Sequence, residues 1–182
     1  METDGKNKSK RDILKDIDPS DALYILKVLM EEDKKFEDKI YQIAVKMLSE
    51  VDSDDIAVEV YNELDRLEVE ELWDRSGKTR YGYVEPSEEA WVMFEEVLKP
   101  FVEEMKKYQK LIMFMEAKNY CIGIIKGIQE YEQESKSEFK DWAIDVPAEY
   151  IVRIMDEWMK GNPDSKDIAE VEEIARSYTE FN

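Results

Sequence analysis

The residue types best suited to chemistry are carboxylates, which concentrate over residues 50–74. This stretch holds eleven acidic residues and a single base, Arg66. Asp55, Glu59 and Glu63 follow one another at intervals of four, so on a helix their carboxylates share one face and could reach one divalent cation. An apolar stripe that begins at Ile56 occupies the opposite face. A solvated helix face is therefore the simpler interpretation of this cluster.

A second pair of carboxylates, Glu68 and Glu71, follows in the same acidic stretch. This pair resembles one half of the magnesium site of all-helical nucleotide pyrophosphatases. Those enzymes hold magnesium with two short acidic pairs on neighbouring helices. The matching pair here would be the acids at 138 and 141, at a long distance along the chain. A divalent-metal-dependent hydrolase that uses Glu59 and Glu63, or Glu68 and Glu71, is therefore an alternative function.

Several catalytic and metal-binding chemistries are excluded by composition. The chain has no histidine, the side chain that most often acts as general base or metal ligand near neutral pH. Its one cysteine, Cys121, rules out an intramolecular disulfide and a zinc site of several cysteines. It also contains no glycine-rich phosphate loop and no nucleophile elbow. We therefore predict no catalytic residue and no cofactor.

The charge of the chain is strongly negative and unevenly placed. There are 45 acidic and 26 basic residues, for a formal net charge of −19. Residues 1–18 hold five of each, so the surplus falls on the rest of the chain. An acidic body repels nucleic-acid phosphates and anionic membrane surfaces, and the sequence has no apolar run of 18 residues. We predict a cytoplasmic protein with neither nucleic-acid nor membrane partners.

Helical periodicity dominates the sequence and predicts an all-α fold. We expect about seven helices, packed as antiparallel hairpins in a bundle or a short solenoid-like array. Residues 1–17 should form a polar N-terminal segment and residues 18–182 a single all-α domain. Pro100 lies inside a helical pattern and predicts a kink or a break. The helices are expected over residues 19–30, 36–51, 53–73, 86–115, 118–133, 146–160 and 168–178, and residues 132–140 are expected to form a polar linker.

The longest predicted loop, residues 74–85, carries aromatic and basic side chains together. It contains two glycines, two tyrosines and a local basic cluster, and a short extended segment is expected around its end. Aromatic and arginine side chains are enriched at the energetic centres of protein interfaces. In the alternative, Trp73 has a purely structural role and packs against Trp91 in the core. We predict an interaction patch formed by Trp73, Lys78, Arg80, Tyr81 and Tyr83.

The most apolar helix, residues 118–133, is expected to be the central and most buried element. Two glycines on it, Gly123 and Gly127, lie four residues apart. In lipid this spacing is typical of dimerising helices, but in a water-soluble chain it favours the close approach of a neighbouring helix. A homo-oligomeric structural protein, assembled through this helix or through the last one, is a further alternative function.

A family resemblance covers residues 18 to about 160. The segments DPSDALYILKVLMEEDKKFEDKI, YGYVEPSEEAW and VMFEEVLKPFVEEMKKYQKLIMFMEAKNYCIGIIKGI resemble the α-helical region that accompanies SWIM-type zinc fingers. The resemblance implies a helical array. The zinc finger itself needs Cys-x-Cys and Cys-x-His, which this chain lacks, so neither a metal nor a nucleic-acid function carries over. The predicted function is a non-catalytic protein–protein interaction or scaffold module, whose partner is another protein or a second copy.

Overall fold

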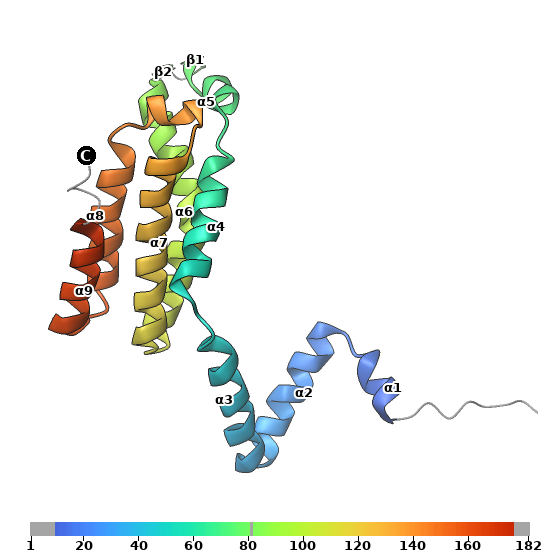
Figure 1. Ribbon diagram of the computed structural model, residues 1–182. Coiled ribbons are helices and arrows are strands. Elements are labelled where there is room, and N and C mark those ends of the chain that lie inside the picture. Colours follow the sequence, from blue (N-terminus) through green and yellow to red (C-terminus); the bar gives the residue numbers. More distant parts are fainter. Residues whose placement is uncertain (1–9, 81, 177–182) are drawn as a thin grey trace, which may run out of the picture. The chain divides into compact units, whose positions relative to one another are not determined.

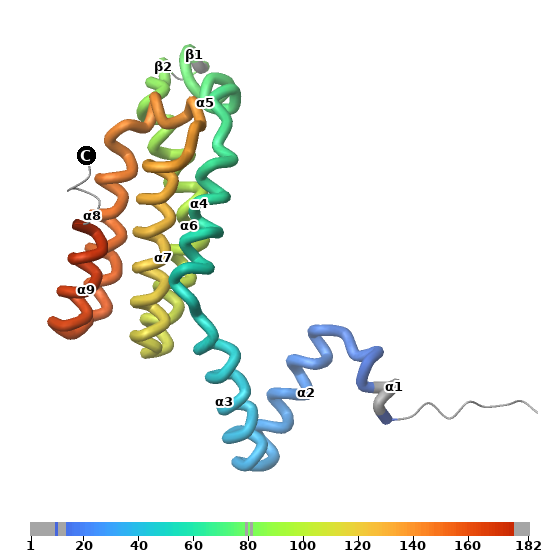
Figure 2. The backbone as a smooth tube through the Cα atoms, in the orientation of Figure 1, coloured from blue at the N-terminus to red at the C-terminus, as the bar shows by residue number. Residues whose placement is uncertain are grey.

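A computed structural model describes residues 10–80 and 82–176 and confirms the all-α class (Figures 1 and 2). Contacts between residues divide the chain into two compact units, residues 1–50 and residues 51–182, which are described separately below. The single domain over residues 18–182 stays a prediction. None of the described helices is both long enough and apolar enough to cross a membrane.

Over residues 10–50, the described part of the first unit, the chain forms the helices α1 (Lys10–Lys15), α2 (Pro19–Glu32) and α3 (Lys34–Leu48). The predicted start of α2 is confirmed: the Asp18 carboxylate accepts hydrogen bonds from the backbone N–H groups of Ser20 and Asp21 at 2.8 and 2.9 Å, and Pro19 follows as the first helical residue. A single residue, Asp33, joins α2 to α3 and caps α3 through the N–H of Lys35.

The second unit is a helical bundle with a small β-hairpin. Consecutive long helices run antiparallel, as predicted, and α7 lies at the centre with α4, α6, α8 and α9 packed around it (Figure 1). Its core includes Cys121, Ile124 and Ile128, all without solvent exposure. The elements are α4 (Ser53–Asp65), α5 (Val69–Arg75), β1 (Gly77–Thr79), β2 (Gly82–Val84), α6 (Pro86–Lys110), α7 (Phe114–Glu134), the 3-10 helix η1 (Glu138–Trp142), α8 (Val146–Met159) and α9 (Ser165–Arg176).

Close packing of α7 on α4 depends on the two glycines of α7. A Cβ atom on Gly123 would lie 2.6 Å from the Ile56 Cβ, and one on Gly127 would lie 2.6 Å from the Ala57 carbonyl oxygen. Both distances are well inside van der Waals contact, so only glycine lets the helices approach this closely. The predicted close approach of a neighbouring helix is confirmed, and α4 rather than a second copy covers this face of α7.

Several predicted helix boundaries were wrong. The segment over residues 53–73 divides into α4 and α5, and the N-cap of α4 is Asp52, whose carboxylate accepts from the N–H of Asp54 at 2.7 Å. The fourth helix ends at Lys110 rather than near 115. Pro100 does not break α6, because it removes only one backbone hydrogen bond while buried residues on both sides, Leu98 and Val102, hold the helix against the core.

The segment predicted as a polar linker, residues 132–140, is also structured. Helix α7 continues to Glu134, and the side chain of Phe139 is completely buried in η1. The loop over residues 74–85 forms a two-stranded antiparallel hairpin where one extended segment was expected, with Lys78 opposite Tyr83. Gly77 and Gly82 have φ angles of +86° and +141°, which other residues rarely adopt.

Candidate functional site: an aromatic patch at one end of the bundle

Two exposed tryptophans from distant parts of the sequence meet at one end of the second unit. Trp73 lies on α5 and Trp142 ends η1. Their ring centroids are 6.4 Å apart and the rings are nearly perpendicular, at 88°, which is the favourable edge-to-face arrangement. The two side chains remain 57% and 39% exposed. A pair of large aromatic rings that is ordered and still open to solvent is suited to binding.

The β-hairpin lies at the same end of the unit as α5 (Figure 1), and its sequence contains basic and aromatic residues. Lys78 and Tyr83 are direct cross-strand partners, so their side chains project from the same face of the hairpin. Both are exposed, as is Arg80 in the turn. Of the predicted patch residues, Tyr81 lies outside the described residues. We use the name aromatic patch for Trp73, Lys78, Arg80, Tyr83, Trp142 and the exposed Ile144.

Sequence reasoning missed Trp142 and Ile144. They lie shortly after the predicted polar linker of residues 132–140, and the signal that could have found them is the short apolar run from 142 to 144 between Asp141 and Asp145. The alternative that packs Trp73 against Trp91 was wrong. Trp91 instead contacts Tyr150 on α8, with ring centroids 5.8 Å apart.

Helix α5 is held in place by a buried edge and by ion pairs. Leu72 is fully buried, whereas Trp73 on the following position faces outward. The Arg75 guanidinium contacts Glu89 at 2.7 Å and Glu96 at 2.9 Å, both on α6. The hydrogen bond from Arg75 lowers the pKa of Glu96, and the same bond raises the pKa of Arg75. These contacts stabilise the orientation in which Trp73 is presented.

A network of serine hydrogen bonds positions η1 beside α5. The Ser137 hydroxyl accepts from the N–H of Phe139 at 3.2 Å and donates to the Leu67 carbonyl, also at 3.2 Å. The Ser135 hydroxyl donates to the carboxylate of Asp65, the last residue of α4. The connection between α4 and α5 is thus bonded to the segment that carries Trp142, which accounts for the contact between the two tryptophans.

The four candidate metal ligands are not brought together. Glu59 and Glu63 line a groove between α4 and α6, and the Glu63 carboxylate is bonded to Arg66. Glu68 lines a different groove, and Glu71 lies 3.5 Å from Arg75. Within residues 10–80 and 82–176, no group of three or more acidic or cysteine side chains could hold a metal ion.

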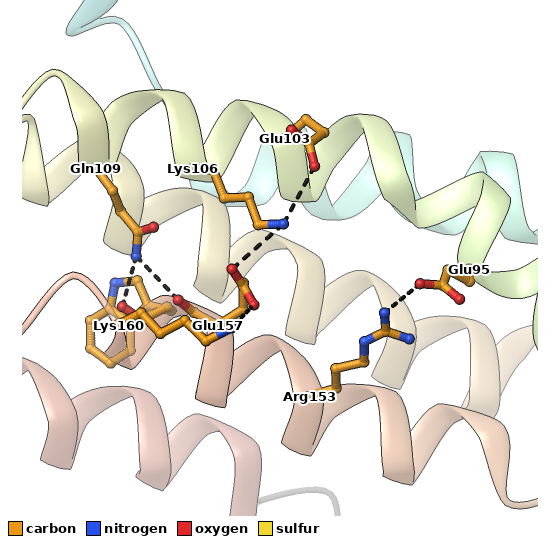
Figure 3. Close-up of polar contacts among 8 residues, drawn as sticks. Glu95, Glu103, Lys106, Gln109, Arg153, Glu157 and Lys160 are labelled. Atoms are coloured by element: carbon orange, nitrogen blue, oxygen red, sulfur yellow. Dashed lines mark hydrogen bonds and ion pairs between the residues drawn. The ribbon is translucent and has the colours of Figure 1, made fainter.

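A third groove, between α6 and α8, is lined by charged side chains that pair with one another. Figure 3 shows Lys106 between Glu103 and Glu157, at 3.4 and 3.5 Å, and Arg153 bonded to Glu95. The Gln109 side chain, to the left of Lys106 in Figure 3, donates from its amide to the Trp158 carbonyl at 2.7 Å. Because these charged groups pair with one another, we interpret the groove as part of the packing contact between α6 and α8 and not as a binding site.

Comparisons of the chain with protein-family models, with curated proteins and with solved structures find no match. The resemblance to the helical region that accompanies SWIM-type zinc fingers stays a prediction.

Proposed function

We propose that the chain is a non-catalytic protein-interaction module that binds a partner protein through the aromatic patch. The observation that carries this proposal is the edge-to-face contact of Trp73 and Trp142, both of which remain open to solvent. Tryptophan and tyrosine supply large contact areas at a low cost in side-chain entropy and dominate the binding energy of many interfaces.

The charges around the patch indicate the kind of partner. Lys78 and Arg80 are basic residues on the hairpin of a chain whose net charge is −19. A protein segment with an apolar side chain for the tryptophan pair and a carboxylate near Lys78 would complement both features. Nucleic acid is not proposed as a partner, because the acidic surplus repels phosphate. The same negative charge disfavours attachment to anionic membrane surfaces, and the one cysteine, Cys121, is a free buried thiol. We therefore propose that the protein works in the cytoplasm.

Affinity capture from a lysate of the host tests this function. The wild-type protein, the variant Trp73→Ala/Trp142→Ala and the control Phe114→Ala are immobilised in equal amounts. Phe114 is the matched control, because it is an exposed aromatic residue and the first residue of α7, which begins at the end of the bundle opposite the β-hairpin (Figure 1). We expect the wild type and the control to recover the same partner and the double variant to lose it. Equal recovery by all three would remove the patch from consideration.

A binding measurement with the recovered protein then gives the size of the effect. Truncating one central aromatic residue of an interface typically costs about 2 kcal/mol or more, which is roughly a 30-fold loss of affinity. Circular dichroism of the double variant checks its folding. The exposed rings contribute little to the core, so we expect its helix content to match that of the wild type.

A further inference from the structure

Helices α2 and α3 of the first unit expose apolar side chains along both of their lengths. No residue of either helix is buried. On α3, Phe36, Ile43 and Met47 recur at helical spacing and form one stripe. A stripe of this kind normally faces a core, and two short helices joined by one residue are too small to bury it between themselves.

The exposed apolar surface is close to what a stable interface requires. A large apolar side chain presents about 200 Å² when fully exposed. At roughly half exposure, seven such side chains offer on the order of 700 Å², against the roughly 800 Å² that each partner buries in a standard protein interface. Their exposed fractions run from 38% to 72%, and the seven are Leu23, Ile25, Leu26, Met30, Phe36, Ile43 and Met47.

The charges of the two helices are complementary to each other. Helix α2 has three acids and one base, for a net charge of −2. Helix α3 has four lysines and two acids, for a net charge of +2. If α2 of one copy packs against α3 of another, each copy supplies the charge that the other needs. This reciprocity is the property of an interface with two-fold symmetry, in which the same patch serves both partners.

The distribution of charge along the chain points to the same partner. Residues 1–50 contain twelve acidic and ten basic residues, so they contribute only −2 to the net charge of −19. The remaining −17 belongs to residues 51–182, whose surfaces repel their own copies. The first unit is therefore the part of the chain whose self-association is least opposed by electrostatics.

We propose that two copies of the chain associate through the α2–α3 hairpin, with α2 of one copy against α3 of the other, to form a four-helix dimer interface. The interface shares no residue with the aromatic patch. It also shares none with the Gly123 and Gly127 face of α7, which α4 covers.

Light scattering of the full-length protein measures whether two copies associate. The wild type should have twice the chain mass of 21.6 kDa. The variant Phe36→Ser/Ile43→Ser should have the mass of one chain. The control Tyr41→Ser should remain a dimer, because Tyr41 is more exposed than Phe36 and Ile43 but lies more than a third of a turn from the stripe. A monomeric wild type at about 100 μM, or a dimer that survives the double substitution, would overturn the proposal.

A charge-swap experiment keeps the test independent of the apolar substitutions. In one variant, Lys39→Glu/Lys46→Glu makes both helices acidic, and in the other, Glu31→Lys/Glu32→Lys makes both basic. Each variant alone should be monomeric, and an equimolar mixture should form a heterodimer. A mixture that stays monomeric, or single variants that dimerise as well as the wild type, would contradict the pairing of α2 with α3. Neither result bears on partner binding by the aromatic patch, so the two proposals fail separately.

Discussion

The rings of Trp73 and Trp142 contact each other edge to face, with their centroids 6.4 Å apart. One ring comes from a short helix that ends before the β-hairpin and the other from a 3-10 helix that follows the central helix. Both supporting segments are anchored by buried residues, Leu72 and Phe139, and by polar contacts to neighbouring elements. The pair is thus presented by a rigid part of the molecule, which lowers the entropy that binding must offset.

Tryptophan fluorescence should separate the two patch tryptophans from the other two. Trp158 is almost fully buried and Trp91 is half-buried, whereas Trp73 and Trp142 are exposed. We expect acrylamide to quench much of the wild-type emission and much less of the emission of Trp73→Phe/Trp142→Phe, whose maximum should also move to shorter wavelength. The control Trp91→Phe should retain most of the quenching. Equal quenching of the wild type and the double variant would show that the patch is covered.

Substitution of Gly127 by alanine should destabilise the bundle. In an ordinary helix this change is favourable by about 1 kcal/mol. Here the added Cβ would lie 2.6 Å from the Ala57 carbonyl oxygen, so the helices must separate, at a net cost of about 1–3 kcal/mol. Urea unfolding followed by circular dichroism measures the difference, with the exposed Val58→Ala on α4 as the control. A more stable Gly127→Ala would contradict the close packing of α4 and α7.

Lys118 should make the stability of the α7–α9 contact depend on pH. Its side chain is only 8% exposed and its ammonium lies 2.8 Å from Asp167 and 3.0 Å from Glu170. The hydrogen bond to Asp167 is the main reason that its pKa is raised in the folded state. A raised pKa stabilises the fold fully below the unfolded value, near 10.5, and this contribution is lost as the pH rises through the folded value.

The variant Lys118→Met measures this contribution. We expect the free energy of unfolding to fall by about 1.5–3 kcal/mol at pH 8, because a charged hydrogen-bond donor is removed and two carboxylates lose their partner. The difference from the wild type should shrink above pH 10.5. The exposed Lys166→Met on α9 serves as the control and should show almost no difference. A difference for Lys118→Met that is constant from pH 8 to pH 11 would contradict the charge-based account.

Calorimetric titration with Mg²⁺, Mn²⁺ and Ca²⁺ tests the hydrolase alternative. In the groove that holds Glu59, the carboxylates of Glu63 and Glu96 already contact Arg66 and Arg75. We therefore expect no saturable binding below about millimolar cation, since the metal would have to displace these arginines. Saturable binding that is lost in Glu59→Gln would support the metal-dependent hydrolase and contradict the proposal of a non-catalytic module.

The sequence predicted the parts of the fold that depend on local periodicity. The start of α2 at Pro19, the central position of α7 and the close approach at Gly123 and Gly127 all follow from residue spacing or from the properties of single residues. The division of residues 53–73 into two helices could not be predicted in this way. It depends on hydrogen bonds from Ser135 and Ser137, which lie far along the chain.

The candidate site was only partly predictable for the same reason. Trp73, Lys78, Arg80 and Tyr83 were singled out because they are neighbours in the sequence. Trp142 comes from a distant segment, and the polar composition of that segment gave no indication that Phe139 is fully buried and holds it against the bundle. The helices of the first unit differ from those of the bundle, because the hairpin alone does not bury the apolar side chains that α2 and α3 carry.

Site-specific photo-crosslinking in host cells detects a partner protein bound at the two patch tryptophans. The full-length protein carries a benzophenone amino acid at one position, as Trp73→p-benzoylphenylalanine, Trp142→p-benzoylphenylalanine or, as the control, Phe114→p-benzoylphenylalanine. We expect positions 73 and 142 to crosslink to one and the same partner protein, because their rings lie 6.4 Å apart, and position 114 to give no such product. No adduct at 73 and 142, or the same adduct at 114, would contradict a binding function of the aromatic patch.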